Sequence, residues 1–264
     1  MNNSISIITV CKNSIDDLKK TVDSILDLEY KYLEYIIIDG DSSDGTLGYI
    51  TDLIQTFSNK HIDYKFISEA DGGIYYAMNK GIMLAKNEWI NFMNAGDLFH
   101  HSTCLNELFS GTISNQVSVL YGNAIEKYSF GEILISENKL NKKNTVMPFC
   151  HQASFVRNNV LKIFKFNTMY RIIADHDLFY RLRRENYIFE YRPVLITKYN
   201  AQYGISAENP ILVNIEKLKI YGIDTKWYYI IKLIYVFVRS GSVHVLKNIL
   251  SPKIVDIIMK RRRS

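Results

Sequence analysis

Acidic side chains gather in one loop near the start of the chain. Residues 39–46 read DGDSSDGT and include Asp39, Asp41 and Asp44. Neighbouring carboxylates suggest calcium, but the EF-hand pattern fails because its glycine is one place out of register and Ile50 stands where the closing glutamate belongs. A carboxylate at a strand end can accept hydrogen bonds from a base or a ribose, so Asp39 favours a nucleotide site. The alternative is an acidic turn that ends in a helix start just after Asp44.

A second acidic position closes the motif NAGD, residues 94–97, just beyond another predicted strand. Hard divalent cations prefer oxygen ligands and commonly bind one or two carboxylates together with substrate phosphates. A lone aspartate in a turn is normally a cap, but the position of Asp97 at the end of a strand favours metal binding.

The segment EADGGIYYAMNKGI, residues 69–82, contains paired glycines before a predicted helix that starts at Ile74. Glycines allow close backbone approach, and a helix N-terminus favours phosphate. The alternative is a tight turn followed by a surface helix. The chain has no GxGxxG and no GxxxxGK[ST] motif, which argues against a dinucleotide dehydrogenase and a P-loop enzyme.

The elements that must position these residues alternate between strand and helix. Apolar strands are predicted at residues 6–11, 35–39, 62–68 and 89–93, separated by helices that start at Ser14 and span residues 46–57 and 74–85. Ser14 is expected to cap its helix, with Asp17 completing a capping box. This pattern predicts a Rossmann-like, mostly parallel sheet covered by helices on both faces. Ligands of such sheets bind beyond the carboxyl ends of the strands, where the residues above lie.

The second half of the chain is mixed in pattern. Strands are predicted at residues 117–121 and 132–135, a helix at 175–184 and an extended segment at 188–198. Within the helix, residues two apart point to nearly opposite sides. Asp175 shares its side with Leu178 and Leu182 and is expected to face the domain. Asp177 shares its side with Arg181 and is expected to form a surface ion pair.

Composition limits the class of protein. The 264 residues are 47% hydrophobic, enough for one full domain core. A net charge of +5 and a pI near 8.9 favour anionic partners. Three cysteines without a CxxC pair make a disulfide framework or a zinc site improbable. No signal peptide and no spanning apolar run are found in the sequence, so we expect a cytosolic catalytic part.

The composition changes from Trp227 onward, becoming apolar-aromatic and then basic. We therefore expect a catalytic domain over residues 1–225 and a C-terminal helical appendage over 226–264. Ser251 and Pro252 are typical of a helix start, and the helix they would begin has an apolar side and ends in the KRRR sequence. Such a helix suits an anionic membrane surface. The alternative is a helix packed on the domain with a solvated tail.

Taken in order, several segments resemble the inverting glycosyltransferase family 2, whose fold is called GT-A, and in particular its members that build capsule, colanic acid or O-antigen. The matching segments are SIITVCKN, IIIDGDSSDGT, ISEADGGIYYAMNKGI, WINFMNAGD, CHQASFVR, IIADHDLFYRL and AQYGIS. They span about residues 4 to 206. Each is modestly specific, and the ordered set is much more so.

The resemblance implies a role for each matching position. Donor or nucleotide contacts are implied for Thr9, Asp39, Asp41, Asp71, Asn94, Ala95 and Gly96. Asp97 is similar to the family's metal-binding carboxylate, for Mn²⁺ or Mg²⁺. Asn94 and Gly96 stand where many relatives carry further acids, which leaves a second metal carboxylate in question. Met78 replaces an arginine common in relatives, which puts the phosphate contacts in question.

Further implied roles concern the catalytic and acceptor sides. Asp175 resembles the catalytic base, with Ala174 in place of the glutamate of the family's Glu-Asp pair. Simple helix capping is the alternative for Asp175. His151 and Gln152 resemble an element on the acceptor or diphosphate side, although a lone histidine is as often structural. Residues 202–206 resemble a mobile loop over the donor.

These roles predict transfer of a sugar from a nucleoside diphosphate, UDP first and GDP second, to a saccharide hydroxyl. The acceptor is expected to be lipid-linked, for example through polyprenyl diphosphate, at the inner face of the cell membrane. A sugar-1-phosphate nucleotidyltransferase is disfavoured because the loop CKNSIDDLKK lacks glycine. A non-catalytic carbohydrate- or membrane-binding protein is the rival from another class, and the presence of Asp39, Asp97 and Asp175 together argues against it. Nucleic-acid binding rests only on charge and the terminal KRRR and is not expected.

Overall fold

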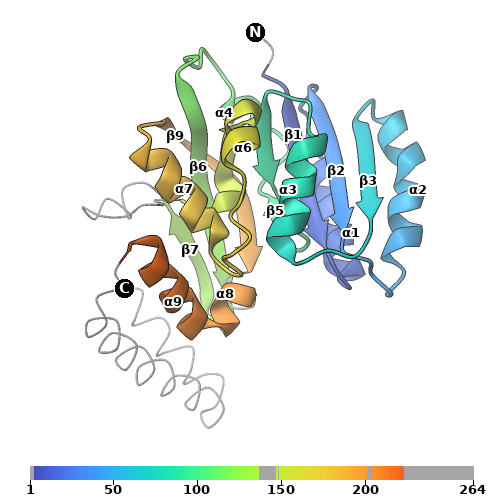
Figure 1. The fold of residues 1–264 in the computed structure, drawn as a ribbon. Coiled ribbons are helices and arrows are strands. Elements are labelled where there is room, and N and C mark those ends of the chain that lie inside the picture. Colours follow the sequence, from blue (N-terminus) through green and yellow to red (C-terminus); the bar gives the residue numbers. More distant parts are fainter. Residues whose placement is uncertain (1–2, 137–146, 148, 201–203, 223–264) are drawn as a thin grey trace. The chain divides into compact units, whose positions relative to one another are not determined.

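Four strands, most of them rich in apolar residues, pair in parallel at one half of a single sheet (Figure 1). The strands are β1 (Ile5–Cys11), β2 (Leu33–Asp39), β3 (Asp63–Ser68) and β4 (Trp89–Phe92). In the register, Cys11 lies beside Asp39, and Asp39 lies beside Ser68. The carboxyl ends of these strands therefore meet at one edge, as predicted.

The computed structural model of the chain describes residues 3–136, 147, 149–200 and 204–222. The described chain divides into two compact units. Of the described residues, the larger unit comprises 3–126, 134–136, 147 and 149–199, and the smaller unit comprises 127–133, 200 and 204–222.

The rest of the sheet contains antiparallel pairs, which the sequence patterns did not predict. The order is β3-β2-β1-β4-β8-β6-β9-β5, with β7 paired to β6. The further strands are β5 (Leu98–Phe99), β6 (Val117–Tyr128), β7 (Gly131–Ile135), β8 (Ser154–Arg157) and β9 (Ile188–Asn200). β8 runs antiparallel to both β4 and β6, and β9 runs antiparallel to β5. The fold is thus a mixed α/β sheet flanked by helices.

Alternating strand residues divide the core into two clusters, one on each face of the sheet. On one face, Ile7 and Ile37 pack with α1 (Ile15–Leu26), α2 (Thr46–Asn59) and α4 (Cys104–Leu108). On the other, Ile8 and Ile38 pack with α3 (Ile74–Leu84), α6 (Asn158–Phe164) and α7 (Ala174–Arg184). Figure 1 shows α3, α6 and α7 on the same face of the sheet.

One carboxylate organises the starts of the first two helices. Asp44 accepts hydrogen bonds from the backbone N–H of Ile15 at 2.9 Å and from the hydroxyl of Thr46 at 2.6 Å. These bonds, led by the one from Thr46, lower the pKa of Asp44. The turn interpretation of Asp44 is confirmed. Ser14 is the N-cap of α1 but forms no side-chain cap bond, so the expected capping box with Asp17 is wrong.

The smaller unit contains α8 (Ile205–Glu208) and α9 (Pro210–Ile220), the latter with proline in its first turn. The predicted appendage, residues 226–264, lies outside the described residues. Among the described helices, none has the length and apolarity needed to cross a membrane.

Candidate active site

Two predicted nucleotide contacts are completely buried at the carboxyl ends of the parallel strands. The Asp39 carboxylate is 0% exposed and accepts bonds from the backbone N–H of Ser42 at 3.1 Å and the hydroxyl of Ser68 at 2.7 Å. It also accepts a bond from the Ser42 hydroxyl. Thr9 is buried too, and its hydroxyl donates to the carbonyl of Met93 at 2.7 Å. These side chains hold the loops together, and their contact with a donor stays a prediction.

Two further predicted contacts line the surface of the same edge. Asp41 is exposed, with a backbone φ of 63° in the left-handed region. Asp71 is half-buried, and its carboxylate accepts a bond from the backbone N–H of Gly73 at 2.8 Å. A Cβ atom on Gly40 would come within 3.3 Å of the Asp71 carboxylate, so glycine allows this close approach. Asp71 therefore packs against the loop that Asp39 fastens.

The NAGD motif forms a tight turn after β4. The backbone N–H of Asp97 donates to the carbonyl of Asn94 at 2.9 Å, and Gly96 has a φ of 97° that favours glycine. The N–H of Ala95 bonds to β1 through the carbonyl of Val10 at 3.3 Å.

A residue that the sequence patterns did not single out secures this turn from α1. The hydroxyl of Thr21 accepts from the N–H of Gly96 at 2.9 Å and lies 2.9 Å from the carbonyl of Asp97, to which it can donate. Thr21 is fully buried in α1 and looks like an ordinary helix residue in the sequence.

The Asp97 carboxylate lies half-buried in a polar setting. Its Oδ2 accepts a bond from the side-chain amide of Gln152 at 3.0 Å. Burial raises the pKa of Asp97 to about 6, although the charge of His151 and the bond from Gln152 oppose the rise. Asn94 Oδ1 is buried without a hydrogen-bond partner among the described residues. A carboxylate and an unpartnered amide oxygen on one turn suit a hard divalent cation.

A cation here would depend on ligands from outside the protein for most of its coordination. Across the described ranges, no group of three or more histidine, cysteine, aspartate or glutamate side chains is placed to hold a metal ion. A site with one carboxylate is typical of Mg²⁺ that is shared with substrate phosphates.

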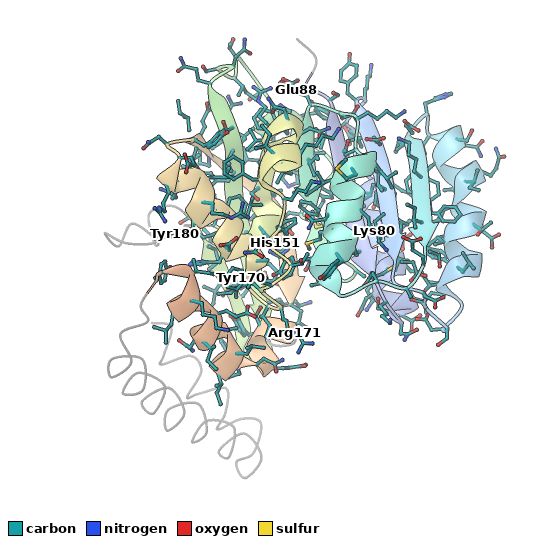
Figure 2. All side chains as sticks on the ribbon, in the orientation of Figure 1. Lys80, Glu88, His151, Tyr170, Arg171 and Tyr180 are labelled. Carbon is teal, nitrogen blue, oxygen red and sulfur yellow. The ribbon has the colours of Figure 1, made fainter. Side chains whose placement is uncertain are left out.

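His151, labelled in Figure 2, lies between the turn after β4 and helix α7 and is in contact with both. Its Nδ1 lies 3.3 Å from Oδ2 of Asp175, and its Nε2 lies 3.3 Å from the amide nitrogen of Asn94. Burial opposes protonation, but the bond to Asp175 and the charges of Asp175 and Asp97 outweigh it and raise the pKa of His151. The imidazole therefore joins the Asp97 and Asp175 regions.

Asp175 faces the interior of the larger unit, as its helix position predicted. Leu178 and Leu182 on the same side of α7 are buried. Burial of Asp175 favours its neutral form, but the bond and charge of His151 outweigh this and lower the pKa of Asp175. The N-cap of α7 is Ile173, without a side-chain cap bond, so Asp175 is not the N-cap residue itself. Its Oδ1 nevertheless accepts a bond from the N–H of His176 at 2.9 Å in the first turn, as the capping alternative expects.

The ion pair predicted for Asp177 is present, but its expected surface position is wrong. Asp177 is 6% exposed and bonds to Arg181 Nε at 2.7 Å. The Arg181 guanidinium also donates to the carbonyls of Phe164 at 2.9 Å and Lys165 at 2.7 Å. These contacts, far apart in sequence, place the pair against the end of α6, with Asp177 buried and Arg181 partly exposed.

Tyr75 is a second contact that the sequence patterns did not reveal. Its hydroxyl lies 2.6 Å from the carbonyl of Ile172 and 3.3 Å from Oδ1 of Asp175. In the sequence it stands within an apolar helix, where an aromatic residue is normally part of the core.

Comparison with known proteins gives a consistent result. A sequence model of the family described as "Glycosyl transferase family 2" matches residues 6–179. The chain is 28% identical over 240 residues to a PGL/p-HBAD biosynthesis glycosyltransferase of Mycobacterium bovis, and the match covers 89% of both proteins. It is 31% identical over 188 residues to an uncharacterised glycosyltransferase of Mycobacterium tuberculosis, covering 67% of this chain and 68% of that protein.

Solved structures share the fold. A mannosyltransferase from Pyrobaculum calidifontis, in complex with GDP-Man and Mn²⁺, superposes with a TM-score of 0.66 at 14% identity, covering 98% of this chain and 79% of that one. S. aureus TarS 1-349, in complex with UDP-GlcNAc, gives 0.60 at 15% identity, and the match covers 78% of this chain but only 60% of the TarS chain. The likeness concerns the fold alone and confirms the predicted α/β architecture.

Proposed function

We propose that this chain moves a sugar from a nucleoside diphosphate to a saccharide hydroxyl, with inversion at the anomeric carbon. The chain belongs to glycosyl transferase family 2 and is a glycosyltransferase of glycan biosynthesis with the GT-A fold. The observation that carries the proposal is a pair of neighbouring contacts. His151 bonds to Asp175, and the next residue, Gln152, bonds to Asp97. Two consecutive residues therefore link Asp97, a carboxylate suited to binding a cation, with Asp175, a carboxylate suited to accepting a proton.

Asp175 is the proposed general base. An incoming hydroxyl must lose its proton as it attacks the anomeric carbon, so an ionised carboxylate must stand beside it. The pKa of Asp175 is lowered by His151, against the effect of burial, which keeps the carboxylate ionised at neutral pH. His151 also fixes the direction of the carboxylate. Displacement in one step leaves no covalent enzyme intermediate.

Asp97 is the proposed ligand of Mn²⁺ or Mg²⁺, with Asn94 Oδ1 as a neighbouring oxygen. When bound, such a cation stabilises the charge that develops on the leaving diphosphate. Gln152 holds the Asp97 carboxylate at 3.0 Å and so sets its direction. The mannosyltransferase neighbour was solved with Mn²⁺, which supports this choice of metal.

The donor is proposed to be a UDP-sugar, with a GDP-sugar as the second choice. The neighbours solved with UDP-GlcNAc and GDP-Man support a nucleoside diphosphate sugar of either kind. The proposed donor contacts lie at the carboxyl ends of the parallel strands: Thr9, Asp39, Asp41, Asp71, Asn94, Ala95 and Gly96. Asp41 and Asp71 are the carboxylates of this set most open to a ligand, because Asp39 is buried.

The acceptor is proposed to be a lipid-linked saccharide in surface polysaccharide synthesis, reached at the inner face of the membrane. The basic KRRR end of the chain and the apolar residues before it support contact with anionic lipid. His151 and Gln152 are proposed to line the acceptor or diphosphate side.

The test is release of nucleoside diphosphate from a panel of UDP-glucose, UDP-galactose, UDP-N-acetylglucosamine and GDP-mannose, with and without Mn²⁺. We expect at least one donor to release its diphosphate, faster with Mn²⁺. A sugar-1-phosphate nucleotidyltransferase would instead release pyrophosphate from a nucleoside triphosphate. Binding of these donors without turnover under any metal condition would contradict the proposed catalysis and favour the non-catalytic rival.

A further inference from the structure

Two polar side chains on one side of α3 form hydrogen bonds with the segment that leads into α7. We call this segment, residues 165–173, the α6–α7 connection. Tyr75 and Asn79 lie one helical turn apart, and each bonds to backbone atoms of the connection. The two contacts fix the connection near its beginning and near its end.

Asn79 holds the beginning through a reciprocal pair of hydrogen bonds. Its Nδ2 donates to the carbonyl of Phe166 at 2.9 Å, and its Oδ1 accepts from the N–H of Phe166 at 2.9 Å. Both polar groups of one residue are satisfied by a single side chain, which leaves Phe166 little freedom to rotate.

Tyr75 holds the end, immediately before Asp175. Its hydroxyl lies 2.6 Å from the carbonyl of Ile172 and 3.3 Å from Oδ1 of Asp175. The ring is 7% exposed and packs on Phe166, with 5.4 Å between ring centroids. Burial raises the pKa of the Tyr75 hydroxyl, so it stays protonated. Its single proton points mainly to the nearer oxygen, the carbonyl of Ile172, and Oδ1 of Asp175 lies within reach of the same hydroxyl.

α3 also begins at the donor side of the sheet. Its N-cap is Gly73, whose N–H bonds to Asp71, one of the proposed donor contacts. Tyr75 is the second residue of the helix. A single rigid turn therefore links the loop that contains Asp71 to the carboxylate of Asp175.

From these contacts we propose that Tyr75, supported by Asn79, is a positioning residue that sets the place and direction of the Asp175 carboxylate. The inference rests on the proposed role of Asp175 as the base and goes beyond it by naming what holds the base. Asp175 is then contacted from two sides, at Oδ1 by the N–H of His176 at 2.9 Å and the hydroxyl of Tyr75, and at Oδ2 by His151.

A residue that only stabilises the fold and a residue that positions Asp175 should behave differently when they are replaced. Loss of a residue that only stabilises the fold lowers the melting temperature and has the same relative effect on turnover whether or not Asp175 is present. Loss of a positioning residue lowers turnover only while the residue it positions is intact. A double-mutant cycle separates these cases.

The first experiment needs no substrate. Hydrogen exchange is measured by mass spectrometry on full-length wild type, Tyr75→Phe, Asn79→Ala and the matched control Tyr64→Phe. Tyr64 also donates its hydroxyl to a backbone carbonyl, that of Ile50 at 2.8 Å, but lies on β3. We expect faster exchange over residues 166–176 in Tyr75→Phe and Asn79→Ala and no change there in Tyr64→Phe. Unchanged exchange over this segment in Tyr75→Phe overturns the proposal.

The second experiment measures release of nucleoside diphosphate from the most active donor of the panel. Tyr75→Phe should lower kcat about tenfold, because it removes the hydroxyl that holds Ile172 and lies against Asp175, with the donor KM nearly unchanged. In the Asp175→Asn background the same change should alter kcat less than about twofold. Equal relative losses in both backgrounds overturn the positioning role. If Asp175→Asn alone is fully active, the base assignment fails instead, and the exchange result still decides whether Tyr75 holds the connection.

Discussion

The imidazole of His151 lies with Nδ1 3.3 Å from the carboxylate Oδ2 of Asp175, although a strand and a helix separate them in the chain. Burial disfavours the charged form of each group, yet the pKa of His151 is raised and that of Asp175 is lowered. Each shift arises mainly because the partner outweighs burial. The charged form of each group therefore stabilises that of the other against burial.

This pair predicts a defined pH window for stability. A raised histidine pKa stabilises the fold below the ordinary value of about 6.5, and this contribution is lost as the pH rises through the folded value. A lowered aspartate pKa stabilises the fold above about 3.9, and this contribution is lost as the pH falls through the folded value. Both contributions are present between those two values. His151→Gln should therefore lower the melting temperature most near pH 5 and much less near pH 8.

The control is His101→Gln, which breaks an exposed pair with Glu107 at 2.9 Å. Exposed pairs contribute little. A loss of melting temperature in His151→Gln that is the same at pH 5 and pH 8 would refute the ion pair.

Metal affinity should depend on pH through Asp97. Its pKa is raised to about 6, so protons compete with a cation below that value. Calorimetric titration of Mn²⁺ into the protein with UDP present should show affinity falling by about tenfold per pH unit below pH 6. Asp97→Asn should bind Mn²⁺ weakly at every pH. Titrating this variant over the same pH range also shows how far protonation of UDP itself weakens Mn²⁺ binding. Equal affinities for wild type and variant at pH 7 would exclude Asp97 as a ligand.

Donor binding should depend on Asp39 through the loop that it fastens. An asparagine in its place keeps one acceptor oxygen where the carboxylate uses both, for Ser42 and Ser68. We expect Asp39→Asn to raise the UDP dissociation constant at least about tenfold, the effect of roughly one lost hydrogen bond to a charged group. Asp52→Asn, at an exposed position on α2, is the control. Equal UDP affinity before and after the change at Asp39 would remove Asp39 from the donor site.

Membrane contact should depend on the basic end of the chain. A triple change of Arg261, Arg262 and Arg263 to glutamate should weaken binding to vesicles that contain phosphatidylglycerol at least about tenfold, because each basic residue near an anionic surface contributes about 1 kcal/mol. Vesicles of phosphatidylcholine alone serve as the control. Unchanged binding to the anionic vesicles would favour the alternative in which this end packs on the protein.

The sequence predicted the parallel half of the sheet because its strands are continuous apolar runs that end at polar loops. β1 to β4 lie within two residues of the predicted ranges at each boundary. The antiparallel half was less predictable. β8 spans only Ser154–Arg157, and β6 continues to Tyr128 through polar residues that mask its period. These strands are fixed by long-range pairing rather than by local pattern.

The site shows the same division between local and long-range information. The position of Asp175 on the inner side of α7 followed from helical periodicity. The burial of Asp177 did not, because it depends on carbonyls at the end of α6. The contact of Tyr75 with Asp175 likewise joins two helices far apart in the chain. Periodicity assigns the side of an element that a residue occupies and can assign a partner on the same helix, such as Arg181 for Asp177. Partners on other elements follow only from the tertiary structure.

The comparison of Asp175→Asn with Asp177→Asn tests the central claim most directly, by steady-state release of nucleoside diphosphate from the most active donor. Asp175→Asn should lower kcat on the order of 10²-fold while the donor dissociation constant stays nearly the same, because the base acts on the acceptor. Asp177→Asn should retain most turnover and instead lower stability by roughly 1–3 kcal/mol, because the buried Arg181 pair loses its charge. The reverse ranking of turnover, with Asp177→Asn the more damaged enzyme, would contradict the assignment of Asp175 as the base.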